Sequence, residues 1–327
     1  MGSGIYGLPF TPEESRVVVV PVPFEATTSY GGGTAGGPAA VFEASKQVDL
    51  FDRETGRPYE AGIAMLDIPK MIVRWNAQAK KLGRRHVKKV NAISERVSEW
   101  VYDTTSALLD AGKMPVTLGG DHSVSFGAIQ AYAERHPGLG ILHLDAHADL
   151  RDSYEGFTWS HASIFHCVMT RLDRVARLVQ VGVRDLGRAE SAMIEASRGR
   201  IVTFFDADVA ARQEQGTPFA SIADAIVSEL PDDVYLSWDI DGLDPTLCPG
   251  TGTPVPGGLS WNEAIGLLRA LVRAKKRIVG LDLCEVAPGA TEWDANVGAR
   301  LLYKMIGFAL LTDRESRIAN RDSGGQP

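Results

Sequence analysis

Short runs of apolar residues recur along the chain, and each run is about as long as a β-strand. Between most of these runs, apolar positions repeat every three or four residues, which is typical of helices that cover one face of a sheet. The runs predict strands at Val17–Val22, Val116–Leu118, Gly140–Asp145, Leu178–Val181, Ile201–Phe204, Val234–Trp238 and Arg277–Leu283. The helical spacing predicts helices over Val90–Leu108, from a cap at Ser123 to about His136, and over Asp294–Leu311.

The alternation of apolar strands with helices predicts the fold class. Strands that are apolar throughout are typical of a parallel sheet buried on both faces. We therefore expect an α/β fold with a mainly parallel central sheet between helical layers, and a ligand site beyond the carboxyl ends of the strands. The length of 327 residues suits one large domain, which we place at residues 1–322, with a disordered polar tail at 323–327.

Charge and composition narrow the class of partner. Lys and Arg number 34 and Asp and Glu number 41, so the formal net charge is −7. An acidic chain without a basic stripe of interleaved aromatics argues against nucleic-acid binding. No apolar run is long enough to span a membrane, no signal-peptide pattern precedes the first strand, and the three cysteines lie far apart. We expect a cytoplasmic protein with a small-molecule partner.

One basic stretch stands out, at Lys80–Lys89. We interpret it as a solvated helical face or turn, with a role in subunit contact or in attracting an anion left open.

Residue types that bind metals cluster where three of the apolar strands end. After the strand at 140–144, such residues occupy every second position of residues 145–149, a spacing that can direct all of them towards one point. Two carboxylates share this spacing after the strand at 234–238, and a histidine follows the glycine pair at 119–120. The six candidate ligands are His122, Asp145, His147, Asp149, Asp239 and Asp241.

This inventory of ligands predicts two metal ions rather than one. Four carboxylates and two imidazoles are too many for a single ion and suit a pair of divalent cations bridged by carboxylate. Two such cations would also balance the charge of the four carboxylates, which otherwise repel one another or hold protons. The oxygen-rich donor set without thiolates favours Mn²⁺ over zinc or an iron–sulfur centre, and Ni²⁺ or Co²⁺ remain alternatives.

Several motifs together resemble the ureohydrolase family of arginases and agmatinases. They are GGDHS at 119–123, DAHAD at 145–149, SWDIDGLDP at 237–245 and PGTGTPVPGG at 249–258, and they follow the family's order over nearly the whole chain. The resemblance implies the family's three-layer α/β/α fold, a homo-oligomer (trimer or hexamer), and hydrolysis of a guanidino compound by metal-activated water. It also implies two ligand sets, with His122, Asp145, Asp149 and Asp239 around one manganese and Asp145, His147, Asp239 and Asp241 around the other.

The same resemblance assigns roles to three further residues. His161, in Ser160-His161-Ala162, corresponds to the family's proton shuttle to the leaving amine. Glu285 matches the acid that grips the guanidinium through paired charge-assisted hydrogen bonds, and Thr253 is expected beside it. His166 follows His161 closely enough to line the same pocket, whereas His143, inside an apolar strand, is interpreted as a core histidine.

The motifs indicate the reaction class more clearly than they indicate the substrate. Arginases keep asparagines where this chain has Arg151 and Trp159, so we expect an agmatinase-like enzyme that converts agmatine into putrescine and urea. Asp152 or Glu155 is a candidate partner for the ammonium group of agmatine. Trp159 could instead shorten the pocket for free guanidine or a small guanidino acid such as guanidinobutyrate.

Two alternative functions, each from a different class of protein, fit the sequence less well. A non-catalytic, regulatory homologue would be expected to lack a ligand, yet all six are present. A single-metal amide hydrolase of the deacetylase type would leave His147 and Asp241 without an ion.

Overall fold

A single parallel sheet forms the centre of the computed structural model, which describes residues 3–323. Its eight strands follow the order β2-β1-β3-β8-β7-β4-β5-β6, and every neighbouring pair of these described strands runs parallel. The strands are β1 (Val17–Val22), β2 (Ile63–Met65), β3 (Met114–Gly119), β4 (Leu139–Leu144), β5 (Val175–Val181), β6 (Ile201–Phe204), β7 (Asp233–Asp239) and β8 (Arg277–Cys284). The predicted α/β class with a mainly parallel sheet is confirmed.

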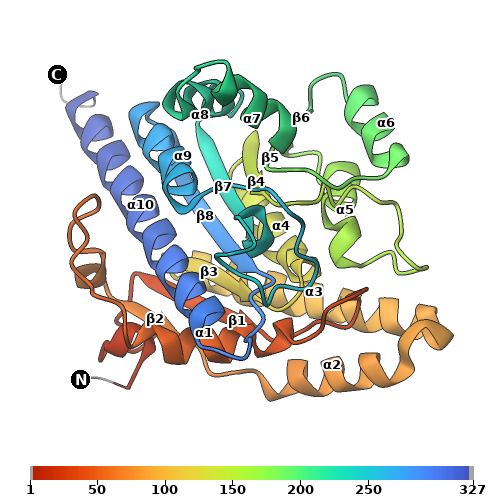
Figure 1. Cartoon of the computed structure of the whole chain (residues 1–327). Coiled ribbons are helices and arrows are strands. Elements are labelled where there is room, and N and C mark those ends of the chain that lie inside the picture. Colours follow the sequence, from red (N-terminus) through yellow and green to blue (C-terminus); the bar gives the residue numbers. More distant parts are fainter. Residues whose placement is uncertain (1–2, 324–327) are drawn as a thin grey trace.

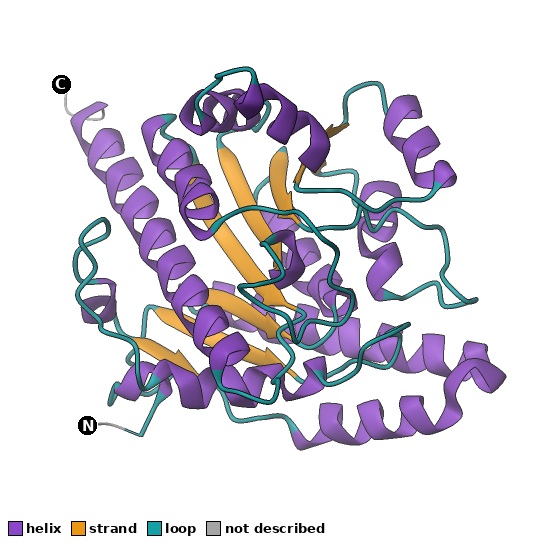
Figure 2. Ribbon diagram, in the orientation of Figure 1, coloured by secondary structure: helices purple, strands orange, loops and turns teal. Residues whose placement is uncertain are grey.

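Helices cover both faces of the sheet (Figures 1 and 2). They are α1 (Gly37–Ser45), α2 (Lys70–Leu82), α3 (Val87–Asp110), α4 (Ser125–Arg135), α5 (Ile164–Arg171), α6 (Arg188–Ala196), α7 (Asp206–Glu214), α8 (Phe219–Ser228), α9 (Trp261–Arg273) and α10 (Trp293–Ser323). Helices α1, α8, α9 and α10 supply one apolar core, and α2 to α5 supply the other. No helix within residues 3–323 is both long and apolar enough to cross a lipid bilayer.

Alternate residues of each strand enter different cores, which explains why the strands are apolar throughout. In β4, Leu142 and Leu144 pack in the core beside α9 and α10, whereas Ile141 packs in the core beside α3 and α4. In β7, Trp238 and Tyr235 divide in the same way, and both side chains are fully buried. A strand with two buried faces has no position left for solvent-facing polar residues.

Three local features differ from the sequence-based expectation. Strand β2 was not predicted, because three residues at the sheet edge are too short to stand out as an apolar run. The helix that follows β3 is capped by Asp121 rather than Ser123, since the Asp121 carboxylate accepts hydrogen bonds from the Ser123 backbone N–H and hydroxyl. Helix α10 continues to Ser323, and the rest of the predicted tail, 324–327, lies outside the described residues.

The strand order gathers the candidate site at one edge of the sheet. Strands β3, β8, β7 and β4 are consecutive neighbours, so their carboxyl ends meet side by side. Gly242 allows the closest approach between the segments that follow β7 and β4, because a Cβ atom there would lie 2.7 Å from the Asp145 nitrogen. Asp149 and Glu285 have φ angles of +53° and +63°, a left-handed backbone conformation that is uncommon for residues other than glycine and is often found at functional sites.

Candidate metal centre and active site

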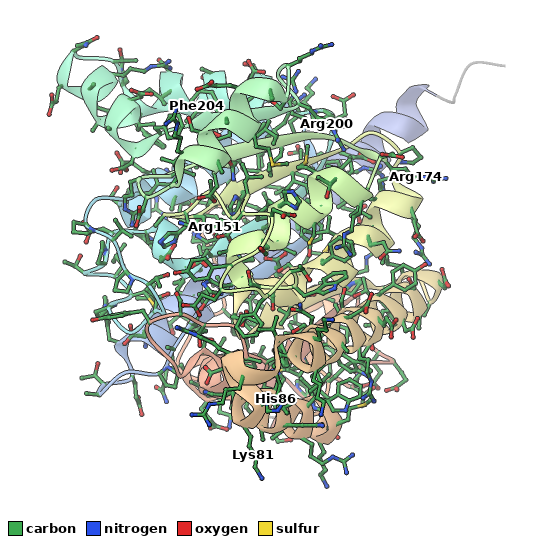
Figure 3. The ribbon with its side chains drawn as sticks, turned by 90° about the vertical axis from the view of Figure 1, so that its right-hand side faces the viewer. Lys81, His86, Arg151, Arg174, Arg200 and Phe204 are labelled. Atoms are coloured by element: carbon green, nitrogen blue, oxygen red, sulfur yellow. The ribbon has the colours of Figure 1, made fainter. Side chains whose placement is uncertain are left out.

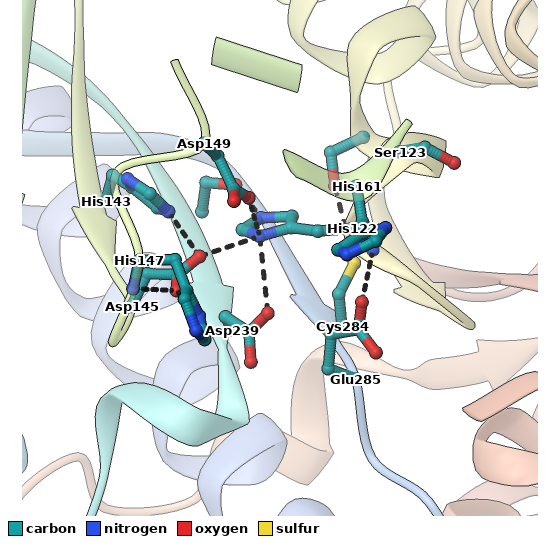
Figure 4. A network of polar contacts seen from close by, with 12 residues as sticks. His122, Ser123, His143, Asp145, His147, Asp149, His161, Asp239, Cys284 and Glu285 are labelled. Carbon is teal, nitrogen blue, oxygen red and sulfur yellow. Dashed lines mark hydrogen bonds and ion pairs between the residues drawn. The ribbon is translucent and has the colours of Figure 1, made fainter. Parts of the chain in front are cut away.

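One cluster of polar side chains surrounds His122, the first residue of a short 3₁₀ turn (His122–Val124) after β3. Its Nδ1 atom lies 3.2 Å from Asp145 Oδ2, 3.5 Å from Asp149 Oδ2 and 3.6 Å from Asp239 Oδ2. All four side chains are buried. The cluster therefore places one imidazole nitrogen and three carboxylates around a common point (Figure 4).

A second cluster adjoins the first through Asp145. The Nδ1 atom of His147 lies 3.3 Å from Asp145 Oδ1 and 3.2 Å from Asp241 Oδ2. Asp145 thus faces His122 with one carboxylate oxygen and His147 with the other. A carboxylate shared in this way is the arrangement that joins two neighbouring cation sites.

The positive charges of the protein itself do not balance the negative charges of the aspartates in the two clusters. Burial, and then the negative charges of neighbouring aspartates, raise the pKa values of Asp149 and Asp239 well above their usual range. Although burial opposes protonation of His147, the nearby carboxylates of Asp145 and Asp241 raise its pKa to about 12. Hydrogen bonds from His122 and His143 outweigh the effect of burial and hold the pKa of Asp145 well below its usual range. Bound cations would relieve the same imbalance.

The donor set fits divalent cations. Asp241 Oδ2 and Glu285 Oε2 are buried, and neither accepts a hydrogen bond from any described residue. Buried oxygens without a donor are costly unless a cation or ligand occupies the space that they face. The lone thiol nearby, Cys284, is deep in the core, where burial raises its pKa well above the ordinary range, so it remains a neutral core residue.

Neighbouring residues fix the orientation of His122. Its Nε2 atom lies 2.9 Å from the Ser237 hydroxyl, which in turn donates to the buried Asp282 carboxylate at 3.0 Å. Because the Ser237 proton is directed to Asp282, Nε2 of His122 must be the donor to Ser237. In the neutral form of His122, which a metal ligand must adopt, Nδ1 then has a lone pair that faces the carboxylates. Neither Ser237 nor Asp282 was singled out from the sequence, since neither belongs to a ligand pattern.

A cavity of about 270 Å³ opens over the two clusters. His161 and Thr253 line it, as do His147 and Asp149. Glu285 is buried and does not line it, and its Oε1 accepts from the His122 backbone N–H at 3.1 Å. The His161 ring lies edge-on to Tyr154 with 5.9 Å between centroids, and its Nδ1 lies 3.5 Å from the Thr27 hydroxyl. Burial, and then the charge of His147, lower the pKa of His161 to about 4, so its imidazole is neutral in this environment.

Besides Glu285, two residues predicted to contact the substrate do not line the cavity. Trp159 turns away from it and packs edge-on against Phe126, with 5.1 Å between ring centroids, beneath the guanidinium of Arg171. Asp152 is largely exposed, and its carboxylate lies 3.8 Å from His166, which does not line the cavity either. Sequence spacing does not determine the direction of side chains in the irregular loop that follows Asp149, so contact of these two residues with the substrate stays a prediction.

Part of the basic stretch at Lys80–Lys89 contacts the loop that follows Asp149. Arg84 pairs with Glu155 at 2.5 Å, and Lys80 pairs with the buried carboxylate of Glu25, which also accepts a hydrogen bond from the Gly33 backbone N–H. Part of the stretch thus braces two loops next to the cavity, whereas Lys81 and His86 lie at the outer end of the α2–α3 hairpin (Figure 3). Glu155 is therefore engaged away from the cavity.

Several residues of the cavity wall were not predicted. They come from the segments after β4 and β5, including the start of α6, and carry no recognisable spacing that would indicate their direction. They include Arg151, Tyr154, Asp185 and Glu190. Behind the wall, Arg184 donates to the backbone carbonyls of Gly182, Asp241, Leu243 and Val255.

Known proteins resemble this chain over most of its length. A family model described as the arginase family matches residues 15–307. The chain is 36% identical over 306 residues to the N(1)-aminopropylagmatine ureohydrolase of Thermus thermophilus, covering 93% of this chain and 94% of that protein. It is 34% identical to the agmatinase of Bacillus anthracis, covering 84% of this chain and 85% of the relative.

A solved structure has the same fold. The agmatine ureohydrolase of Thermoplasma volcanium superimposes with a TM-score of 0.76 at 24% identity, covering 96% of this chain and 97% of that one. The chain therefore belongs to the arginase family and is a hydrolase of guanidino carbon–nitrogen bonds, as its motifs predict.

Proposed function

We propose that this protein uses two divalent cations to hydrolyse agmatine, or a closely related amine-ended guanidino compound, into urea and an amine. The observation that carries the proposal is the position of Asp145, whose two oxygens face two different histidine–aspartate clusters at the floor of one cavity. The family membership of the chain supports the reaction class.

The residues that would hold the cations follow from the two clusters. His122, Asp145, Asp149 and Asp239 would hold one ion, and Asp145, His147, Asp239 and Asp241 the other. Divalent cations bound there would lower the pKa of a water molecule, so that a nucleophile is available at neutral pH. Oxygen and imidazole donors favour Mn²⁺, and Ni²⁺ or Co²⁺ remain alternatives.

The rest of the reaction requires a group that holds the guanidinium and a group that moves a proton. Glu285 suits the first role because its Oε2 is a buried acceptor without a donor, and two guanidinium N–H groups can pair with one carboxylate. Thr253 lines the same cavity and would contact the substrate beside it. His161, a neutral imidazole beside Thr27, would carry a proton to the nitrogen of the leaving amine.

Agmatine is preferred to the other substrates for three reasons. The relatives named above are an agmatinase and an N(1)-aminopropylagmatine ureohydrolase, and both names denote amine-ended guanidino compounds. Free guanidine and small guanidino acids were considered because Trp159 could shorten the cavity, but Trp159 packs outside it. Arginine is disfavoured because Arg151 stands where arginases have an asparagine, so the α-carboxylate and α-amino groups would lose their usual partners.

A urea-release screen tests the proposal. The protein is freed of metal with a chelator, reloaded separately with Mn²⁺, Ni²⁺ or Co²⁺, and assayed with agmatine, N(1)-aminopropylagmatine, arginine, 4-guanidinobutanoate and guanidine. We expect about two metal ions per chain and the highest kcat/KM with an amine-ended compound. Urea release from none of these compounds would favour the non-catalytic homologue, and equal or better use of arginine would contradict the assigned substrate.

A further inference from the structure

We propose that Asp185 binds the distal ammonium group of the substrate and thereby selects amine-ended guanidino compounds. This inference rests on the proposed function. It adds the residue that recognises the chemical group at the end of the substrate opposite to the guanidinium. The relevant geometry is a free carboxylate on the cavity wall beside the metal clusters, on a wall whose arginine, Arg151, is already paired with Glu190.

The backbone places Asp185 next to the reaction centre. Residues His147 and Asp185 form a parallel bridge, and the Asp185 N–H donates to the Ala146 carbonyl at 3.0 Å. Backbones paired in this way lie about 5 Å apart, a distance of the same order as the four-carbon spacer of agmatine. A substrate whose guanidinium reaches the clusters can therefore extend its chain along the wall towards Asp185.

The Asp185 carboxylate is available for a ligand. The residue is exposed at the cavity, and no described residue forms a hydrogen bond or an ion pair with its carboxylate. A free carboxylate is a suitable partner for an ammonium group, which can donate up to three hydrogen bonds.

Arg151, a basic residue of the same cavity wall, is already paired. Arg151 Nε lies 3.4 Å from Glu190 Oε2, and its guanidinium stacks 4.9 Å from the centroid of the Tyr154 ring. Glu190 is buried and fixed in turn, because it accepts from the Gly187 N–H at 2.6 Å and the Leu150 N–H at 3.1 Å. Arg151 and Glu190 together contribute no net charge to the wall, whereas Asp185 contributes a carboxylate without an ion-pair partner among the described residues. The wall should therefore favour an ammonium group over a carboxylate.

The other acids near the cavity are less suited to this role. Asp152 points to solvent beside His166, and Glu155 pairs with Arg84. Neither lines the cavity.

The test compares two substrates that differ only at the distal end. N-pentylguanidine has a methyl group where agmatine has its ammonium, and is otherwise of the same length. Asp185→Asn should raise KM for agmatine about tenfold or more with little change in kcat, which is the pattern for a lost ground-state contact to a charged group. The same substitution should leave kcat/KM for N-pentylguanidine nearly unchanged.

A matched control removes a charge at a different place. Asp208, an exposed acid in the first turn of α7, does not line the cavity. Asp208→Asn should leave both substrates unaffected. Calorimetric binding of agmatine to the same metal-loaded proteins gives a second readout, in which Asp185→Asn should weaken binding by a similar factor.

Three outcomes would overturn the inference while the proposed function stands. These are equal use of agmatine and N-pentylguanidine by the unmodified protein, an equal loss for both substrates in Asp185→Asn, and a larger effect of Asp152→Asn than of Asp185→Asn on agmatine. If the unmodified protein neither binds agmatine nor releases urea from any guanidino compound, both proposals fail.

Discussion

The side-chain amide of Gln180 donates a 3.0 Å hydrogen bond to Nδ1 of His143. The orientation of this amide is fixed, because its oxygen accepts from the Thr203 hydroxyl at 3.0 Å and its nitrogen also donates to the Ala148 carbonyl at 2.7 Å. Nδ1 of His143 is thus an acceptor, and its proton must sit on Nε2, 2.9 Å from Asp145 Oδ2. His143 therefore orients the carboxylate that both clusters share.

His143→Phe should weaken metal binding. The substitution removes the donor to Asp145, and loss of such a supporting partner typically costs tenfold to a hundredfold in metal affinity. Titration of the chelator-treated protein with Mn²⁺ measures the change. His86→Phe, at the exposed tip of the α2–α3 hairpin, is the matched control. Metal affinity unchanged in His143→Phe would show that the shared carboxylate needs no such support.

Substitutions of two ligands should have different effects on metal content. Asp145→Ala removes an oxygen from both clusters, so metal content should fall from about two ions per chain towards zero. Asp241→Ala affects only the cluster of His147 and should leave about one ion. Elemental analysis of the purified variants distinguishes the two. One tightly bound metal in the unmodified protein, with no gain on adding Mn²⁺, would contradict a pair of ions.

His161→Ala should separate chemistry from metal binding. A positioned general acid contributes about a hundredfold or more to turnover, whereas His161 contacts Thr27 and Tyr154 rather than the metal clusters. We expect kcat for agmatine to fall by that factor while the metal content stays the same. Loss of a metal ion in this variant would identify His161 as a ligand instead.

Removal of metal should destabilise the fold. Without cations, the buried carboxylates of Asp149 and Asp239 must hold protons or repel their neighbours, as their raised pKa values indicate. A ligand that binds only the native chain adds about 4 kcal/mol when its free concentration is a thousandfold above Kd. Calorimetric melting with Mn²⁺ and with a chelator should therefore give clearly different Tm values. Identical Tm values would exclude a stabilising metal site.

A second ion-pair cluster, far from the site, should set part of the acid stability. At the start of β7, Arg277 donates to Asp233 through Nε at 2.7 Å and Nη2 at 2.5 Å, and His136 lies 2.8 Å away. Although partial burial opposes it, these contacts lower the pKa of Asp233 to about 2. The stabilisation is fully present above the ordinary aspartate pKa and is lost as the pH falls through the lowered one.

Asp233→Asn should consequently reduce the free energy of unfolding by about 1–2 kcal/mol at pH 7, after allowance for partial exposure. The difference from the unmodified protein should shrink between about pH 4 and pH 2. Urea unfolding at a series of pH values measures it, with Asp232→Asn, an almost fully exposed neighbour, as the control. A difference that does not depend on pH would show that the cost of the substitution is steric.

The fold and the metal-ligand types were predictable because their signals are local. An apolar run such as Val17–Val22 marks a buried strand wherever it pairs, and alternate ligand residues after a strand end share a direction. The cavity wall was not predictable in the same way. Trp159 and Asp185 lie on loops, where direction depends on contacts with distant segments, such as the packing of Trp159 on Phe126. The role of His143 depends on Gln180, a residue of the neighbouring strand.

The position of β8 in the sheet has a consequence for the order of folding. This strand is the last in sequence, yet it pairs with β3 on one side and β7 on the other. The half-sheet that carries His122 and the half-sheet that carries the aspartates are therefore joined only when residues 277–284 have entered between them. A growing chain on the ribosome should acquire no complete metal site before this strand emerges, so uptake of both metals would report that the sheet is finished.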